Sequence, residues 1–384
     1  MDINEYLRIM VDRDASDVYL SVGKPPMYRI EGQVEPIGEV KFSTADLENL
    51  ATGIMSERQK KEFAETMEMN LALALPGVAR FRVNIFQQRG SVGMVIRRIK
   101  ADPMTLADLA LPPVISDISM SKRGLVLVVG ATGSGKSTTL AAMIDHRNVN
   151  EAGHIITIED PIEFVHRHKK SIISQREVGF DTLSFQAALK NTLRQAPDVI
   201  LIGEIRDTET MEAAITFAET GHLCLATLHS NNANQAIERV MNFFPIERHA
   251  QIYLQLSLNL RSIISQRLVR SVDEKRVVAM EVLTDTPRIR DLIKKGDVDI
   301  LKEAMEQGVA EGCQTFDQAL FALYKDGKIS LEQALVNADS ANNLRLKIKL
   351  AGLMVDEEPA AAQSDETTKA RPELRPAAVG FRLR

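Results

Sequence analysis

The chain has 384 residues, with 47 basic and 52 acidic side chains and a formal net charge of −5. Hydrophobic residues make up 45% of it, which is typical of a globular protein that buries a substantial core. Two cysteines exclude a disulfide framework and a four-thiolate zinc site. The acidic balance and few aromatics argue against nucleic-acid binding. Because no apolar run approaches about 18 residues and the acidic N-terminus is unlike a signal peptide, we expect a cytosolic enzyme without a transmembrane segment.

Residues 1–100 are predicted to form a small mixed domain. Apolar residues of the segment 3–11 recur at the spacing of one helical face. The segment Arg80–Phe86 alternates strictly between polar and apolar residues, which is typical of a strand with one buried face. Arg82 therefore lies on the hydrated face. A second strand over Val92–Ile99 is expected to pair with the first.

The next part of the chain changes character. Three prolines in residues 101–123 are typical of a linker, because they prevent a continuous helix. Short apolar strands then alternate with helix-length segments, which predicts an α/β domain with a buried sheet. These predicted strands are Leu125–Val129, Ile155–Ile158, Val199–Ile202 and Leu223–Leu228. Beyond about residue 240 the sequence predicts mainly helices, and residues 351–384 have the composition of a disordered tail.

One glycine-rich segment matches the P-loop pattern G-x-x-x-x-G-K-[ST]. Its residues are Gly130, Ala131, Thr132, Gly133, Ser134, Gly135, Lys136 and Ser137, and Thr138 opens the helix that follows. Glycines allow the tight turn that points successive amides at phosphate oxygens. Lys136 supplies a positive charge to the β- and γ-phosphates, and the Ser137 hydroxyl can ligate Mg²⁺. The pattern predicts an ATP site with Mg²⁺, and the alternative is a chance match in a glycine loop.

Acidic side chains follow two of the predicted strands. Glu159, Asp160 and Glu163 come after the strand at 155–158, and Glu204 follows the strand at 199–202 with Gly203 between them. In an open parallel sheet, ligands bind beyond the carboxyl ends of the strands. Acids there can orient a water molecule or hold magnesium, and the strand before Glu204 resembles a Walker B segment. The simpler alternatives are a solvated acidic turn and a surface glutamate.

Two histidines bracket the strand at 223–228. His222 and His229 are seven residues apart, so they do not share one strand face and a joint metal site is not expected. From sequence physics alone, His229 is equally consistent with a γ-phosphate sensor and with a structural residue. Cys224 lies within the strand and is predicted to be a small core residue.

Taken together, these motifs resemble the type IV pilus retraction ATPases of the PilT/PilU family, within the secretion ATPase superfamily. The resemblance covers about residues 1–350. Segment 130–138 matches the Walker A box, with Ala131 where proline is more familiar. The Asp, Walker B and His boxes follow in order at Ile156–His166, Leu193–Asp207 and Thr220–His229.

The resemblance implies a fold and roles for individual residues. The fold is a PAS-like α+β domain over 1–100, a linker over 101–123, and a RecA-like P-loop ATPase domain over 124–350 that ends in helices. Glu163 is the implied catalytic carboxylate, Glu204 supports the magnesium shell, and His229 contacts the nucleotide phosphates. Arg82 and Arg97 match arginines that reach the nucleotide from the N-terminal domain, and the alternative for both is a solvated sheet face.

The resemblance also implies partners. Family members form homo-hexameric rings that act on a platform protein at the cytoplasmic face of the inner membrane. The segment Arg288–Leu292 keeps three residues of a five-residue motif typical of PilT, namely Ile289, Arg290 and Leu292. This departure resembles PilU, the accessory member of the family. It leaves two hypotheses open: a retraction motor, and a nucleotide-binding accessory that needs a PilT-type ATPase. A nucleic-acid translocase is a third, disfavoured by the acidic balance.

Overall fold

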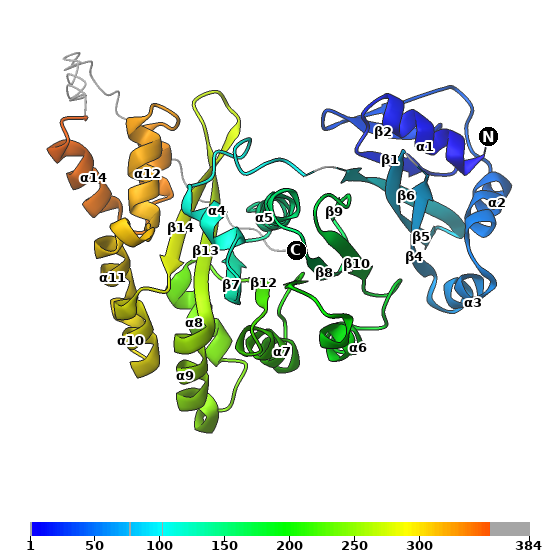
Figure 1. Cartoon of the computed structure of the whole chain (residues 1–384). Coiled ribbons are helices and arrows are strands. Elements are labelled where there is room, and N and C mark those ends of the chain that lie inside the picture. The colour runs from blue at the N-terminus through cyan, green and yellow to red at the C-terminus, as the bar shows by residue number, and fades with distance from the viewer. Residues whose placement is uncertain (1, 77, 102, 354–384) are drawn as a thin grey trace, which may run out of the picture.

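The structure is a computed structural model that describes residues 2–76, 78–101 and 103–353. Two β-sheets organise these residues, one near the N-terminus and one in the centre of the molecule (Figure 1). The predicted tail falls largely outside the described residues.

The first sheet has the strand order β3-β2-β1-β6-β5-β4, with antiparallel neighbours, and β9 pairs with β6 in parallel. Its strands are β1 (Asp17–Leu20), β2 (Met27–Ile30), β3 (Gln33–Pro36), β4 (Glu68–Leu75), β5 (Ala79–Gln88), β6 (Ser91–Ala101) and β9 (Phe164–Val165). Three helices belong to this part of the chain, namely α1 (Ile3–Asp12), α2 (Thr44–Ile54) and α3 (Glu57–Thr66).

The alternation predicted for β5 is confirmed. Phe81, Val83 and Ile85 are fully buried in one cluster with residues of α1 and α2. On β5 and β6, Arg82 and Arg97 are directly opposite each other. Because opposite residues of an antiparallel pair point to the same face, the two arginines share the face that turns away from this core.

The second sheet has the strand order β10-β8-β11-β12-β7-β13-β14, in which β14 alone is antiparallel to its neighbour within the described residues. Its strands are β7 (Gly124–Val129), β8 (His154–Glu159), β10 (Ile172–Glu177), β11 (Val199–Ile202), β12 (Leu223–Leu228), β13 (Leu260–Arg270) and β14 (Arg276–Thr284). The four strands predicted from apolar runs are β7, β8, β11 and β12, and all four are present.

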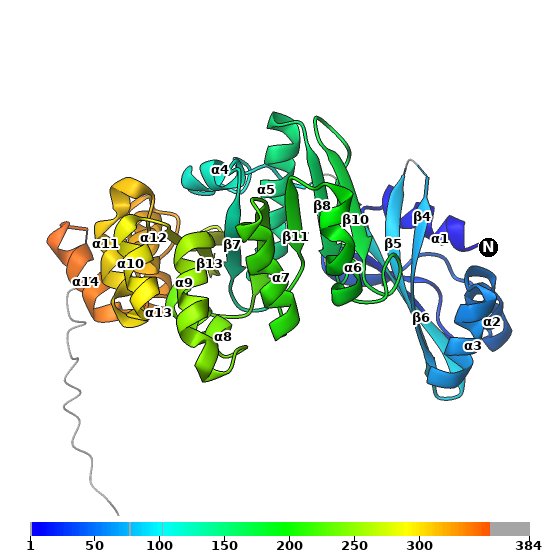
Figure 2. The same cartoon turned by 60° about the horizontal axis from the view of Figure 1, so that its bottom comes forward.

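Helices cover both faces of this sheet, as Figure 2 shows from a second direction. On one face, α4 (Val114–Ser119) and α5 (Lys136–Asn150) pack on alternate strand residues such as Val126 and Leu225. The other face carries α6 (Phe185–Thr192), α7 (Thr208–Glu219), α8 (Ala233–Met241), α9 (His249–Asn259), α10 (Pro287–Lys295) and α11 (Leu301–Gln307). This three-layer arrangement explains why the strands are continuous apolar runs.

The prediction that the region beyond about residue 240 is mainly helical is confirmed, but it omits two strands. After α9 to α11 the chain forms three more helices, α12 (Phe316–Lys325), α13 (Leu331–Val336) and α14 (Ala341–Leu350). These three pack together on residues of β13 and β14. The same region also contains the two long strands β13 and β14, which the sequence reading missed. Polar residues at buried positions of these strands, such as Ser265 and Gln266, interrupt the apolar pattern.

The two sheets meet at β9 and β10. β9 belongs to the segment that follows β8, yet it pairs with the end of β6. Beside it, Arg80 of β5 lies 3.5 Å from the buried carboxylate of Glu177 at the end of β10. The domain boundaries stay a prediction, although β6 ends at Ala101 and β7 begins at Gly124. Within the described residues, no helix has the length and apolarity to cross a membrane.

Candidate active site

The glycine-rich segment forms the turn between β7 and α5. Gly130 has φ +151°, and a Cβ atom there would lie 2.5 Å from the Ser134 hydroxyl oxygen and 2.7 Å from the Gln266 carbonyl oxygen. No side chain fits at that distance. Gly135 has φ +92° and caps α5, so the chain enters the helix through a left-handed residue. The sequence pattern therefore produces a tight loop whose helix N-terminus can face an anion.

A cleft of about 630 Å³ lies over this loop. The predicted binding residues that line it are Thr132, Gly133, Gly135, Lys136, Ser137 and Thr138. The remaining two, Gly130 and Ser134, do not line it; Ser134 is only 6% exposed and borders an adjoining cavity that Gln266 also lines. The cleft is large enough for a small organic ligand.

Lys136 is held by its own loop. Its Nζ donates to the carbonyl oxygens of Gly130 at 2.9 Å and Ala131 at 3.0 Å. Burial lowers the pKa of the ammonium group, while Glu204 and Glu163 oppose that shift by favouring the charge. The lysine is thus a partly buried cation at the mouth of the cleft.

The acids predicted from two strands meet at one edge of the sheet. β8 ends at Glu159 and β11 at Ile202, and these strands are parallel neighbours. Gly203 lets them approach closely, because a Cβ atom there would lie 3.1 Å from Cα of Glu159. The glycine between Glu204 and its strand thus avoids a tight contact with the backbone of β8. Glu163 and Glu204 both line the cleft.

Glu204 is fixed by two partners. Its Oε2 accepts a charged contact from Nη2 of Arg206 at 2.6 Å, and its Oε1 lies 2.9 Å from Nε2 of His229. Oε2 also accepts Nε of Arg206 at 2.8 Å, so the spare lone pair of this carboxylate is on Oε1. The hydroxyl of Ser137 and this carboxylate are the hard oxygen ligands that Mg²⁺ prefers. The donor set of the cleft therefore fits the predicted ion, which the Ser137 hydroxyl would hold while Glu204 would accept hydrogen bonds from ion-bound water.

Glu159 was named among the acids of its turn but was not predicted as a site residue. It lines the cleft, and burial raises the pKa of its carboxyl to about 6, against hydrogen bonds from Thr157 and Gln175 that favour the charged form. The Thr157 hydroxyl donates to it at 2.6 Å. The side chain of Glu163 is exposed and, among the described residues, accepts no hydrogen bond. Of the two carboxylates, Glu163 is the one available to a ligand.

The two histidines lie at opposite ends of β12. His229 lines the cleft and contacts Glu204, whereas Nδ1 of His222 lies 3.1 Å from the Thr220 hydroxyl, away from the cleft. The prediction that Cys224 is a core residue is confirmed, since it is fully buried. Within the described residues, no three His, Cys, Asp or Glu side chains gather as a metal cluster.

Arg82 and Arg97 do not line the cleft of their own chain. Nε of Arg97 donates to the buried carboxylate of Asp17 at 2.7 Å, and 70% of the arginine side chain is exposed. Sequence reasoning also missed Arg80, whose neighbour Glu177 lies at the edge of the second sheet. The strand alternation places Arg80 on the same face as Arg82, but sequence gives no sign of Glu177 as its partner.

A P-loop, acids after two other strands of the same sheet, and a mainly parallel sheet covered by helices on both faces together define a P-loop ATPase. A family model described as "Type II/IV secretion system protein" matches residues 1–348, and the chain belongs to this family.

Curated relatives agree with this family. The chain is 54% identical to the type IV pilus ATPase PilU of Pseudomonas aeruginosa over 351 residues, which cover 91% of this chain and 92% of that protein. It is 45% identical to the retraction ATPase PilT of the same species, over 89% of this chain and all of that one.

Among solved structures, a crystal structure of the pilus retraction motor PilT with bound ADP has a TM-score of 0.84 at 41% identity. The match covers 90% of this chain and 99% of the other. These findings confirm the predicted α/β fold class and show that the chain is an ATPase.

Proposed function

We propose that the chain hydrolyses MgATP as a homo-hexamer and drives or assists the retraction of type IV pili in twitching motility. The observation that carries this proposal is the single cleft that gathers Lys136, Glu163, Glu204 and His229 around the P-loop. The names of the relatives, a pilus ATPase and a retraction ATPase, support the biological role. The proposed location is the cytoplasmic face of the inner membrane, on a pilus platform protein.

Each residue of the cleft has a chemical task in this proposal. The P-loop amides and Lys136 bind the phosphates, and the lysine stabilises charge that develops on the transferred phosphoryl group. Glu163 is exposed to the cleft and orients the attacking water. Glu204, fixed by Arg206, positions His229 toward the phosphates. Ser137 would hold Mg²⁺, which would neutralise charge on the phosphate oxygens when bound.

The arginines of the first sheet complete the site of a neighbouring subunit in this proposal. Arg82 and Arg97 lie side by side on β5 and β6, outside the cleft of their own chain, and Arg97 is largely exposed. An arginine supplied across a boundary stabilises the transition state and makes hydrolysis depend on assembly. In this scheme 1–100 is a PAS-like unit, 101–123 a linker and 124–350 the RecA-like motor unit.

The test is phosphate release from MgATP by the purified chain over a wide range of protein concentration. We expect specific activity to rise steeply with concentration, and Arg97→Ala to flatten the rise while leaving MgADP binding unchanged. The matched control is Arg98→Ala, because Arg98 follows Arg97 on β6, lies on the opposite face of the sheet and contacts Asp14 in the turn after α1. Specific activity that does not depend on concentration would contradict a site completed by neighbours.

A second candidate is a nucleotide-binding accessory subunit that acts only with a PilT-type motor. The observation that favours it is the altered segment Arg288–Leu292, which forms most of α10. Its Arg290 is engaged in an ion pair with Asp285. Retraction by this protein in cells that lack a PilT-type ATPase would exclude the accessory role, and ATP binding without turnover at every concentration would support it.

A further inference from the structure

Two buried polar side chains beneath the P-loop have no hydrogen-bond partner among the described residues. Gln266 is 2% exposed, and both the nitrogen and the oxygen of its side-chain amide are unpaired. The hydroxyl of Ser134 is unpaired as well. Unpaired buried polar groups destabilise a protein and are rare, so each calls for an explanation.

Gln266 lies directly under the loop. β13 runs parallel to β7, and Ser265 pairs with Val129, so Gln266 comes next to Gly130. A Cβ atom on Gly130 would meet the Gln266 carbonyl oxygen at 2.7 Å, and one on Gly135 would lie 3.7 Å from Nε2 of Gln266. The glutamine therefore approaches both the first and the last glycine of the loop.

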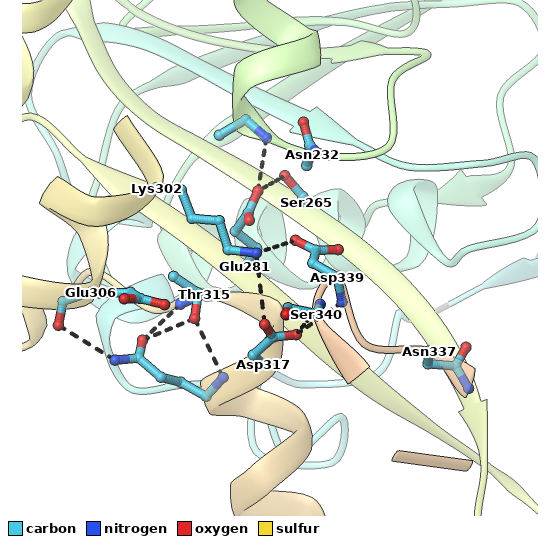
Figure 3. Close-up of polar contacts among 12 residues, drawn as sticks. Asn232, Ser265, Glu281, Lys302, Glu306, Thr315, Asp317, Asn337, Asp339 and Ser340 are labelled. Atoms are coloured by element: carbon cyan, nitrogen blue, oxygen red, sulfur yellow. Dashed lines mark hydrogen bonds and ion pairs between the residues drawn. The ribbon is translucent and has the colours of Figure 1, made fainter. Parts of the chain in front are cut away.

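The strand around Gln266 is held firmly on its other side by what we call the C-terminal polar network (Ser265, Arg267, Glu281, Lys302, Asp317 and Asp339). The Ser265 hydroxyl donates to Oε1 of Glu281 at 3.0 Å, and the same oxygen accepts the Ala233 amide at 2.7 Å (Figure 3).

Arg267, on the same face of β13 as Ser265, donates to Oδ1 of Asp339 at 2.7 Å. Because both neighbours of Gln266 along β13 are anchored, the backbone of Gln266 is held in place and its side chain starts from a fixed point under the loop.

Two backbone carbonyl groups of the loop have the Lys136 side chain as hydrogen-bond donor. Lys136 donates to the carbonyl oxygens of Gly130 and Ala131. When its Nζ turns toward a phosphate group, those carbonyls need another donor, since unpaired carbonyls are costly. Gln266 has two amide hydrogens and one acceptor oxygen at this place, and Ser134 has a hydroxyl.

We propose that Gln266 is a positioning residue of the P-loop. Its amide nitrogen donates to the loop carbonyls that Lys136 releases, and its amide oxygen accepts the Ser134 hydroxyl. The pairing forms when the lysine engages nucleotide phosphates, so part of the binding free energy comes from groups that touch no ligand atom. The inference rests on the proposed nucleotide site. It adds to that site a residue that stabilises the nucleotide-bound conformation of the P-loop without touching the nucleotide.

Gln266→Met tests the proposal, because methionine has a similar length and no strong hydrogen-bonding group. Without nucleotide, we expect the melting temperature to rise by roughly 2 °C, since a buried unpaired amide is removed. With MgADP, we expect the dissociation constant to increase about three- to tenfold, the effect of one or two lost hydrogen bonds. The KM for MgATP rises by a similar factor, and kcat stays within about twofold.

The control is Gln314→Met. Nε2 of Gln314 donates to the Met280 carbonyl oxygen at 2.9 Å, and Met280 is paired with Gln266 across β13 and β14, so this variant loses a formed bond beside Gln266. We expect its melting temperature to fall and its MgADP affinity to stay unchanged. Ser134→Ala should also weaken MgADP binding, and the double variant should be no weaker than Gln266→Met alone.

The outcomes separate the possibilities. Unchanged MgADP affinity in Gln266→Met overturns the positioning role, even if the melting temperature rises. A lower melting temperature without nucleotide also overturns it, since it shows that the amide is already paired. If the wild-type chain does not bind MgADP, the proposed function fails first. If Gln266→Met does not fold, Ser134→Ala carries the same test.

Discussion

The cleft over the P-loop and the C-terminal polar network contain the same kinds of groups in different situations. Each has a lysine beside carboxylates, and each has a glutamate whose pKa burial raises: to about 6 for Glu159 and to about 7 for Glu281. In the network, Lys302 lies 3.2 Å from Asp339 and 3.7 Å from Asp317. Every charge there has a partner of opposite sign or a donor close by.

In the cleft the pairing is incomplete. Among the described residues, Lys136 donates only to main-chain carbonyls, and Glu163 is exposed without a hydrogen bond. Charges that are fully paired inside a protein fix its structure, whereas accessible charges with spare hydrogen-bonding capacity can bind a ligand. The number of acids near a lysine therefore does not identify a site, but their accessibility does.

The largest expected effect distinguishes the two lysines. Lys136→Ala should lower the rate of phosphate release at least about a thousandfold, because the transferring phosphoryl group loses its cation. Lys302→Ala should leave turnover within about twofold and lower the free energy of unfolding by about 1 kcal/mol, because the lysine side chain is itself about one-third exposed. Phosphate release and denaturant unfolding of both variants measure this. A folded, fully active Lys136→Ala enzyme would remove the lysine from the mechanism.

The second prediction concerns the exposed acid of the cleft. Glu163→Gln keeps the shape of the side chain but cannot act as a base, so we expect phosphate release to fall a few hundredfold. MgADP affinity should change less than about threefold, because the residue acts on water and not on the diphosphate. Single-turnover kinetics and calorimetry separate the two quantities. A matching loss of MgADP affinity would instead make Glu163 a binding residue.

The parts of the fold and of the site that could be predicted from the sequence are those that depend on short, continuous segments of the chain. The P-loop and its flanking strand and helix could be predicted, because the glycine spacing is dictated by backbone geometry within eight residues. The buried face of β5 followed from simple alternation. The acids at the ends of β8 and β11 could also be placed at one sheet edge, because parallel strands end together.

The rest depends on tertiary contacts. β13 and β14 were missed because Ser265, Gln266 and Glu281 put polar groups at buried positions, which interrupts the pattern used to recognise strands. These residues are tolerated through partners far away in sequence, as Glu281 is by the Ala233 amide. The same holds for Glu204, whose contact with His229 joins two loops. Sequence spacing alone does not indicate which residues that are distant in the chain come into contact.

The third prediction concerns the effect of Glu281, in the C-terminal polar network, on the pH dependence of stability. Burial raises the pKa of the Glu281 carboxyl to about 7 in the folded chain, whereas in an unfolded chain this carboxyl has its ordinary pKa of 4.5. The unfolded state binds fewer protons between these values, so stability falls as pH rises from 4.5 to 7. Glu281→Gln removes this dependence.

A shift of this size corresponds to about 3 kcal/mol. The difference in unfolding free energy between Glu281→Gln and the wild type should therefore grow by up to about that amount between pH 4.5 and pH 8, in favour of the variant. Denaturant unfolding at several pH values measures it. Glu332→Gln, at an exposed position of α13, is the control and should show no such trend. A difference that stays constant with pH would mean that Glu281 is charged in the folded protein.

The smallest expected effect compares the two ends of β12. His229→Asn should lower kcat about tenfold, because the side chain no longer reaches from Glu204 to the terminal phosphate, and one charged hydrogen bond accounts for a factor of this order. His222→Asn, at the other end, should leave kcat unchanged. Since ADP has no γ-phosphate, MgADP affinity should be the same in both variants, while the KM for MgATP rises in His229→Asn alone. Equal changes in the two variants would mean that β12 transmits general strain and that His229 does not read the γ-phosphate.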